Sequence, residues 1–334
     1  MTRRAYWGVG LAALIFLVVQ VGALALVPTF YEQGYQTVED PTDPTNSLLY
    51  IGAIIGMTAF MLAAFKYDLD KVVRLIIVFT SGVLSWYVFA AVIPIGLVAV
   101  GLSAAVALAL LVYPEWYVID AAGALMGAGA AGLFGISFGL LPALVLLSVL
   151  AIYDAISVYK TKHMLDLAEG VMDLRIPVVL VIPTTLSYSL LDDNFARDAN
   201  DIGDEAEVGD DETKAGDETE ENSDDPDDSD PADRDAFFIG LGDAVMPTVM
   251  VASAAFFSEA SSLGLSVLPA LNLPALLAMV GTFLGFAGLM WAVMQGRAHA
   301  GLPLLNGGAI GGYLVGSVLA GVPLVSALGL APYL

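Results

Sequence analysis

The chain has 334 residues, of which 58% are hydrophobic and only 14% are charged. Soluble domains rarely exceed about half apolar residues, so this composition indicates an integral membrane protein. The sequence contains no cysteine, which excludes disulfides, thiolate metal ligands and a cysteine nucleophile. Its two histidines, His163 and His299, are too few for a zinc site built on several histidines. We therefore expect no metal and no cofactor.

The net charge of −23 is concentrated in one segment. Residues 192–235 hold 21 of the 35 acidic residues and three of the 12 basic residues, a net charge of −18. Such a tract cannot bury enough apolar area to offset its ordering entropy, so we expect a disordered acidic loop. Its composition also suits a high-salt cytoplasm. The negative charge of this loop argues against nucleic-acid binding, which needs a basic surface.

Nine apolar blocks are each close to the roughly 20 residues needed to cross a bilayer. They predict an all-α polytopic membrane protein with transmembrane helices near residues 6–27, 47–65, 72–92, 95–113, 117–135, 138–159, 236–257, 271–294 and 303–325. The first block follows Arg3-Arg4, and it also resembles a secretory signal. Its apolar run of about 22 residues is longer than a usual signal core, so we expect the first helix to be retained.

The basic residues predict the orientation in the membrane. If the N-terminus is cytoplasmic, all twelve of them lie on the cytoplasmic side, namely Arg3, Arg4, Lys66, Lys71, Arg74, Lys160, Lys162, Arg175, Arg197, Lys214, Arg234 and Arg297. The outside loops, including 28–46, then have none, which is the positive-inside bias of membrane proteins. We therefore expect a multi-pass protein of the cell membrane whose N-terminus and 160–235 loop are cytoplasmic and whose C-terminus is outside.

The first part of the 160–235 loop is not of low complexity. It contains a β-branched run bounded by prolines, from Leu174-Arg175-Ile176-Pro177 to Ile182-Pro183. This pattern predicts a short strand, which is too short to span the bilayer. The chain therefore divides into helices one to six (1–165), a strand-containing segment (166–191), the acidic loop (192–235) and helices seven to nine (236–334).

Few acidic residues fall within the predicted spans. Asp120 and Glu259 lie close to span ends, where we expect solvated carboxylates. Asp154 and Asp243 lie deeper, in the cytoplasmic halves of the sixth and seventh spans, and neither has a cationic neighbour in the sequence. A carboxylate in hydrocarbon is costly and usually marks a functional site. Both lie a little over one turn from the same membrane face, so we expect them at one depth.

Two carboxylates held together in a low dielectric cannot both ionise, so they share a proton. One of them can then act as a general acid and the other as a general base. The base activates water for attack on a peptide carbonyl, and the acid protonates the developing oxyanion before the amine leaves. The titrations belong to the pair, not to either residue.

Two further motifs surround these aspartates. Gly240-Leu241-Gly242 directly precedes Asp243, and its glycines allow close helix approach and a bend at a helix start. Ala300-Gly301-Leu302-Pro303 precedes the ninth span, where we expect non-helical backbone that lines a cytoplasmic cavity.

These motifs, together with Tyr153-Asp154 and the nine-span layout, resemble the presenilin / signal peptide peptidase family of intramembrane aspartyl proteases. The resemblance implies that Asp154 and Asp243 are catalytic, with Tyr153, Gly240, Leu241 and Gly242 in support. It also implies substrate contacts from Gly301, Leu302 and Pro303. The family's Pro-Ala-Leu-Pro motif reads Ala300-Gly301-Leu302-Pro303 here, which keeps only the last two residues.

The predicted orientation resembles presenilins, since signal peptide peptidases are inverted. By that analogy, the substrates are transmembrane proteins whose N-termini face outside. With its acidic loop, the chain looks like an archaeal presenilin homologue from a halophile. The sequence does not decide whether partner subunits are needed or whether the loop is itself cleaved.

A substrate transmembrane helix hides its scissile carbonyls in its own hydrogen bonds, so it must unwind, and the freed groups need partners. We hypothesise that a strand over 174–182, including Val179, Leu180 and Val181, pairs with the unwound substrate together with backbone near Leu302.

Other functions fit parts of the pattern. A transporter or channel could use the same aspartates as a proton or cation relay. A prepilin-type peptidase also uses a Gly-x-Gly-Asp motif, but nine spans and the Gly-Leu-Pro element fit it poorly. A non-catalytic scaffold is the remaining alternative.

Overall fold

The computed structural model describes residues 3–67, 69–161, 177–185, 188–190, 236–293 and 300–334, which fold mainly into helices. The long helices of the first part are α1 (Arg3–Glu32), α2 (Thr45–Lys66), α3 (Asp70–Val92), α4 (Gly96–Val112), α5 (Trp116–Ser137) and α6 (Leu140–Ile156). A π-helical turn, η1 (Ser157–Thr161), extends α6. The later elements are α9 (Leu241–Phe257), α10 (Leu273–Val293), α11 (Gly301–Leu319) and the short α12 (Leu324–Ala327) and η3 (Ala331–Tyr333).

The prediction of nine spans is confirmed in part. In the described part of the chain, seven helices are long and apolar enough to cross a membrane. The other two predicted spans correspond to shorter apolar helices, Gly96–Val112 and Leu241–Phe257. The predicted acidic loop 192–235 lies outside the described residues.

The seventh span differs most from its prediction. Residues 236–240 form a strand, β2 (Ala236–Gly240), and α9 begins only at Leu241. The aromatic and β-branched side chains of Phe237, Phe238 and Ile239 favour a strand, and a partner strand is present to pair with it. The apolar pattern alone could not separate a short strand from the start of a buried helix.

The partner is β1 (Val179–Pro183), which runs antiparallel to β2 and pairs Val181 with Phe238. The predicted strand is therefore present but begins after a turn at Pro177-Val178, and residues 174–176 lie outside the described part. Leu241 N–H donates to the Val178 carbonyl at 2.7 Å, so the pairing continues to the first residue of α9. A lone two-stranded sheet is marginal, and this one is stabilised by packing against α1 and α5.

The core lies where α1, α5, α9, α10 and α11 meet. α10 and α11 approach so closely that a Cβ at Gly281 or Gly308 would overlap backbone of the facing helix. On α5, a Cβ at Gly129 would lie 2.6 Å from Val88 of α3. Small residues of this kind let membrane helices pack backbone to backbone.

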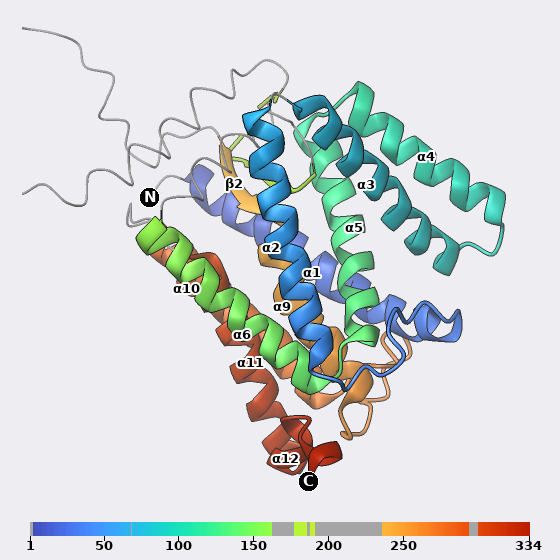
Figure 1. The fold of residues 1–334 in the computed structure, drawn as a ribbon, viewed down its shortest axis with the longest axis vertical. Coiled ribbons are helices and arrows are strands. Elements are labelled where there is room, and N and C mark those ends of the chain that lie inside the picture. Colours follow the sequence, from blue (N-terminus) through green and yellow to red (C-terminus); the bar gives the residue numbers. More distant parts are fainter. Residues whose placement is uncertain (1–2, 68, 162–176, 186–187, 191–235, 294–299) are drawn as a thin grey trace, which may run out of the picture.

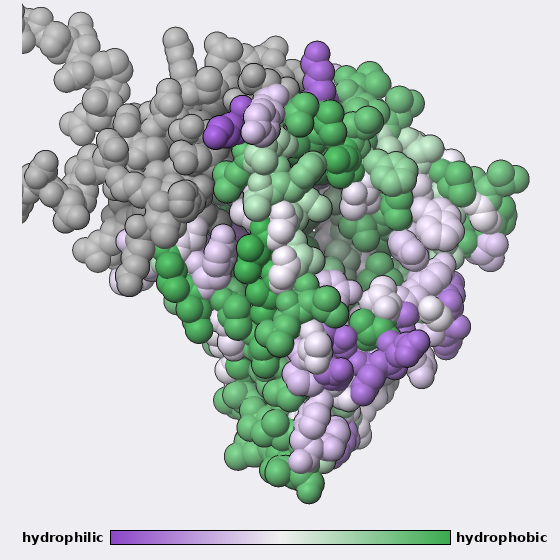
Figure 2. Space-filling view, viewed as in Figure 1, coloured by the Kyte–Doolittle hydropathy of each residue, from purple (hydrophilic) through white to green (hydrophobic). Residues whose placement is uncertain are grey.

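The helices run between two ends of the molecule (Figure 1). The N-terminus, β2 and the end of α6 lie together at the end that we call the site end, and the C-terminus lies at the opposite end. Figure 2 shows apolar side chains over much of the flanks formed by α2, α3 and α4, whereas polar side chains gather around the segment between α1 and α2 and at the upper ends of α2 and α3. Such an apolar flank suits contact with lipid.

Candidate active site

Asp154 lies in the last turn of α6 and is only 5% exposed. Its Oδ2 accepts a hydrogen bond of 3.0 Å from the backbone N–H of Leu302 in α11. A buried carboxylate needs such donors, because an unpaired polar group in hydrocarbon costs free energy. The π-helical turn η1 begins three residues later, at Ser157, and π-helical turns are frequent at functional sites.

Asp243 lies in the first turn of α9, three residues after the end of the strand ladder at Gly240. It is partly buried and interacts electrostatically with Asp154, so the two carboxylates predicted to pair lie near each other. The free N–H groups of a first helical turn favour a negative charge there. The sheet fixes where this turn begins, since β2 leads into α9 without a loop.

The start of α11 joins the two aspartates. Leu302 N–H binds Asp154, and a Cβ built on the neighbouring Gly301 would lie 3.2 Å from Oδ2 of Asp243. The N–H groups of a first helical turn have no partner within their own helix, which is why Leu302 N–H is available. At Gly301 the absence of a side chain leaves space beside Asp243, in the position where the family motif has alanine.

The backbone before the ninth span is less irregular than we expected. α11 begins at Gly301, two residues before the predicted start, and only Ala300 at its N-cap is extended. Pro303 occupies the first turn, where its missing N–H costs no helical hydrogen bond. The expectation of non-helical backbone at 301–302 is therefore wrong, although residues 294–299 lie outside the described part.

Asn306 supports this arrangement and was not singled out by sequence reasoning. It is fully buried, and its Nδ2 donates to the Leu147 carbonyl of α6 at 3.0 Å. Asn306 lies one helical turn beyond Leu302, so both bonds from α11 to α6 come from one helix face. An amide in an otherwise apolar span is the signal that could have found it.

The other predicted site residues differ in how far they are exposed. Tyr153 is 46% exposed on α6, beside Asp154 in sequence. Leu241 is buried at the start of α9, whereas Gly240 and Gly242 are exposed. On β1, Leu180 and Val181 are buried and Val179 is partly buried.

The expectation for Asp120 is wrong. It is not a solvated end carboxylate but is 6% exposed, and its Oδ1 accepts a 2.8 Å hydrogen bond from Val181 N–H of β1. Helix α5 runs beside β1, which removes Asp120 from water. Glu259, beyond the end of α9, is exposed as predicted.

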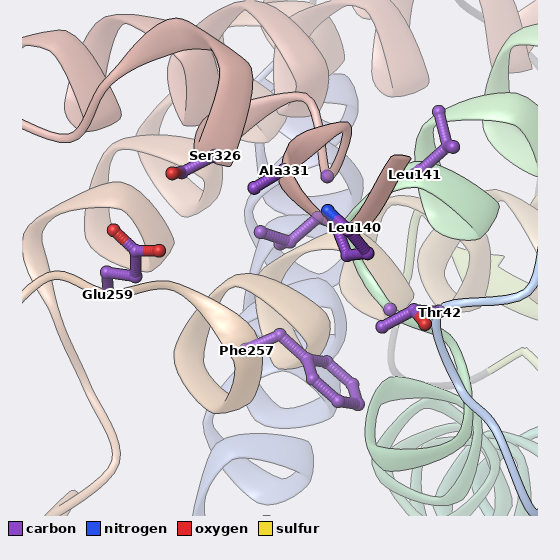
Figure 3. Close-up of a pocket in the computed structure, with 10 residues that line it drawn as sticks. Thr42, Leu140, Leu141, Phe257, Glu259, Ser326 and Ala331 are labelled. Carbon is purple, nitrogen blue, oxygen red and sulfur yellow. The ribbon is translucent and has the colours of Figure 1, made fainter. Parts of the chain in front are cut away.

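A pocket of about 150 Å³ lies at the opposite end of the molecule. Figure 3 shows its lining by Thr42, the start of α6 at Leu140, the end of α9 at Phe257, and the C-terminal segment at Ala331. Asp154 and Asp243 lie at the other ends of the same two helices, so this pocket is separate from the aspartates. Within the described residues, no group of three metal-ligating side chains occurs.

Two aspartates in adjacent membrane helices, joined by the start of a third helix, define the class of intramembrane aspartyl proteases. The model of the signal-peptide peptidase and presenilin aspartyl protease family matches residues 13–322, so the chain belongs to this family. None of the curated proteins matches the chain.

Two solved structures share this fold. A presenilin family intramembrane aspartate protease in space group C222 is 31% identical, with a TM-score of 0.60 over 92% of this chain and 97% of that one. A presenilin family intramembrane aspartate protease in space group P2 is also 31% identical, with a TM-score of 0.55 over 92% of this chain and 96% of that one.

Proposed function

We propose that the protein is an aspartic endopeptidase that hydrolyses peptide bonds within transmembrane segments, with Asp154 and Asp243 as its catalytic dyad. The single observation that carries this proposal is that one short backbone segment, Gly301-Leu302, lies beside both carboxylates: Leu302 N–H binds Asp154, and a Cβ added at Gly301 would lie 3.2 Å from Asp243 Oδ2. A relay for ions needs no backbone segment shared between its carboxylates, whereas a protease must hold two carboxylates at a fixed separation around one water.

The chemistry follows from the pair acting as one titrating unit. One carboxylate removes a proton from water, which attacks the scissile carbonyl carbon. The other donates a proton to the developing oxyanion. Collapse of the tetrahedral intermediate then breaks the C–N bond, and the amine leaves with a proton from the dyad.

The substrates that we propose are single transmembrane segments whose N-termini lie outside. The apolar flank of the protein supports delivery of such a segment from the lipid bilayer. The proposed orientation rests on the twelve basic residues that one side of a nine-span protein would collect. No nucleic acid takes part.

We further propose that the unwound substrate adds a strand to the β1–β2 sheet. Strand pairing would satisfy the backbone groups that unwinding frees in an apolar medium. The sequence assigned the strand around Val179 and Val181, together with the backbone near Leu302, to substrate. Of these donors, Val181 N–H and Leu302 N–H have partners within the chain, in Asp120 and Asp154. The edge of β2 that faces away from β1 is therefore the better candidate.

Substitutions at Gly240 test whether the substrate pairs with this edge of β2. Gly240 ends the ladder opposite Val179, and its φ of −60° is one that proline can adopt. Gly240→Pro removes the N–H and should reduce cleavage. Gly240→Ala is the matched control: it keeps the N–H, and its Cβ would make only an ordinary contact of 3.7 Å with Asp243. Equal cleavage by both variants would reject strand addition at Gly240.

The dyad is tested with purified protein in detergent and a single-span reporter. Asp154→Asn and Asp243→Asn keep the side-chain shapes but remove the acids, so each should abolish cleavage. Asp70→Asn, an exposed aspartate at the start of α3, is the control and should cleave as wild type does. Absence of cleavage by wild type, together with aspartate-dependent ion flux in liposomes, would support a transporter instead.

A further inference from the structure

Asp120 is a buried carboxyl group that the proposed chemistry does not use. It lies in the second turn of α5, and its Oδ2 is buried with no hydrogen-bond partner in the described part of the chain. Its Oδ1 accepts from Val181 N–H. A polar group with one unsatisfied oxygen costs free energy in an apolar medium, so its presence points to a role beyond helix formation.

The hydrogen bond from Val181 to Asp120 shows which residues of β1 bond to β2 and which face away from it. In an antiparallel pair, the N–H groups of alternate residues point toward and away from the partner strand. Because Val181 N–H points to α5, the residues that bond to β2 are its neighbours, Leu180 and Ile182. Pro183, the next residue that faces away from β2, has no N–H. From Val181 onward the outer edge of β1 is thus closed by α5 or lacks a donor, which leaves Val179 as the one strand residue whose N–H faces outward with no bond to α5 in the described part of the chain.

The same strand also holds the first turn of α9. The Val178 carbonyl accepts from Leu241 N–H at 2.7 Å, two residues before Asp243. On α5, one turn beyond Asp120, a Cβ at Gly123 would lie 3.0 Å from Leu180 and 3.8 Å from Leu241. α5, β1 and the start of α9 therefore form one tightly packed unit.

The segment after β1 is bound by the same end of α5. Glu115 accepts from Ser189 Oγ at 2.7 Å and from Leu190 N–H at 3.1 Å. Trp116 Nε1 donates to the Tyr188 carbonyl at 3.0 Å. The first two turns of α5 thus hold the chain on both sides of residues 186–187, and Asp120 is the residue that binds the strand itself.

We propose that Asp120 is a positioning residue of the protease: its hydrogen bond to Val181 fixes β1, and thereby sets both the edge available to substrate and the place of Asp243. This inference rests on the proposed function. Asp120 does not touch the reacting atoms; it acts through β1. Its loss should therefore change where the substrate is cut as well as how fast, since a released β1 edge offers a second place for a strand to pair.

The experiment compares Asp120→Ala and Asp120→Asn in the full-length protein with the single-span reporter. Asp120→Ala should lower kcat by about tenfold, because β1 and the first turn of α9 that carries Asp243 are no longer held in place. Mass spectrometry of the products should show new cleavage positions. Asp120→Asn keeps an oxygen that can accept from Val181 N–H, so it should restore most of the rate and the wild-type positions. Ser103→Ala is the control, because Ser103 is a buried polar residue that bonds only within α4.

Cleavage positions are read from folded, active molecules, so a lower yield of folded Asp120→Ala does not hide the effect. Val181→Pro removes the same bond from the strand side and should give the same new positions. Wild-type rate and positions in Asp120→Ala would overturn the proposal, and so would a loss in Asp120→Asn as large as in Asp120→Ala. If Asp154→Asn still cleaves, the proposed dyad fails instead, whatever Asp120 does.

Discussion

Helices α5 and α2 have the same length, 22 residues, yet they occupy opposite environments. In its most apolar 18-residue stretch α5 is 67% buried, whereas α2 is 6% buried. α5 carries two buried acids, Glu115 and Asp120, and both bind the segment around β1. α2 has only Ser47 and Ala64 buried.

This difference shows that apolar character does not predict burial in a membrane protein. In its most apolar stretch α2 has the higher hydropathy of the two helices, yet it faces outward, because lipid is as good a partner for leucine as protein is. The buried helix is the one rich in glycine and alanine with acids near its start. Close packing and polar contacts, not hydrophobicity, therefore decide which helices support the site.

The largest effect should come from filling a glycine contact on α5. A Cβ at Gly135 would overlap the Ala252 Cβ of α9 and approach its backbone carbonyl carbon at 3.1 Å. Gly135→Ala should lower the free energy of unfolding by about 1–3 kcal/mol, as overpacking does. Gly56→Ala on α2 has nothing within 4 Å and should change it by less than about 0.5 kcal/mol. Thermal unfolding in detergent measures the stability of both variants. Equal losses of stability would contradict the difference between α5 and α2.

A smaller effect, on rate and not on folding, is expected at Asn306. Asn306→Leu removes its bond to the Leu147 carbonyl and also removes its unpartnered Oδ1, so stability should change little. The start of α11 would lose one of its two bonds to α6. We expect kcat to fall about threefold, since an interhelical hydrogen bond in a membrane contributes about 0.6 kcal/mol.

Thr58→Val on α2 is the matched control, because the Thr58 hydroxyl bonds to Ile54 of its own helix. It should leave kcat unchanged. An equal fall in both variants would show that the loss is not specific to the contact between α11 and α6.

The smallest effect should come from the bond that ties α2 to α6. The buried Ser47 Oγ donates to the Pro142 carbonyl at 2.7 Å, at the end away from the aspartates. Ser47→Ala should lower the free energy of unfolding by about 0.6 kcal/mol or less and leave the cleavage positions unchanged. A shift in those positions would mean that α2 helps to place the substrate.

The layout of helices could be predicted from the sequence, because a block of about 20 apolar residues is long enough by itself to cross a bilayer. The site motifs could also be located. Asp154 and Asp243 are acidic residues within apolar blocks, and Gly301-Leu302-Pro303 contains residues that disfavour a helix at the start of another block. The structure places all three motifs together at one end of the molecule. Their catalytic roles stay predictions.

The contacts that hold the site could not be predicted, because they join segments far apart in the chain. The hydrogen bond from Val181 to Asp120 links residues 61 positions apart, and that from Leu302 to Asp154 links residues 148 apart. A carboxylate near a span end, such as Asp120, looks solvated until its partner strand is known. Likewise, residues 236–240 run directly into an apolar helix, and their short apolar run could be identified as a strand only once β1 was known to lie beside them.

The direct passage of β2 into α9 sets a length scale for the reaction. Gly240 and Asp243 are three residues apart, with no loop between them to absorb movement. A substrate strand that shifts along β2 presents the same hydrogen-bonding groups again only after two residues, roughly 6.6 Å, because successive residues of a strand face opposite ways. Under the proposed strand addition, each such shift would bring the second peptide bond along the substrate to the same carboxylates, so the sheet would set a two-residue step between cleavage positions.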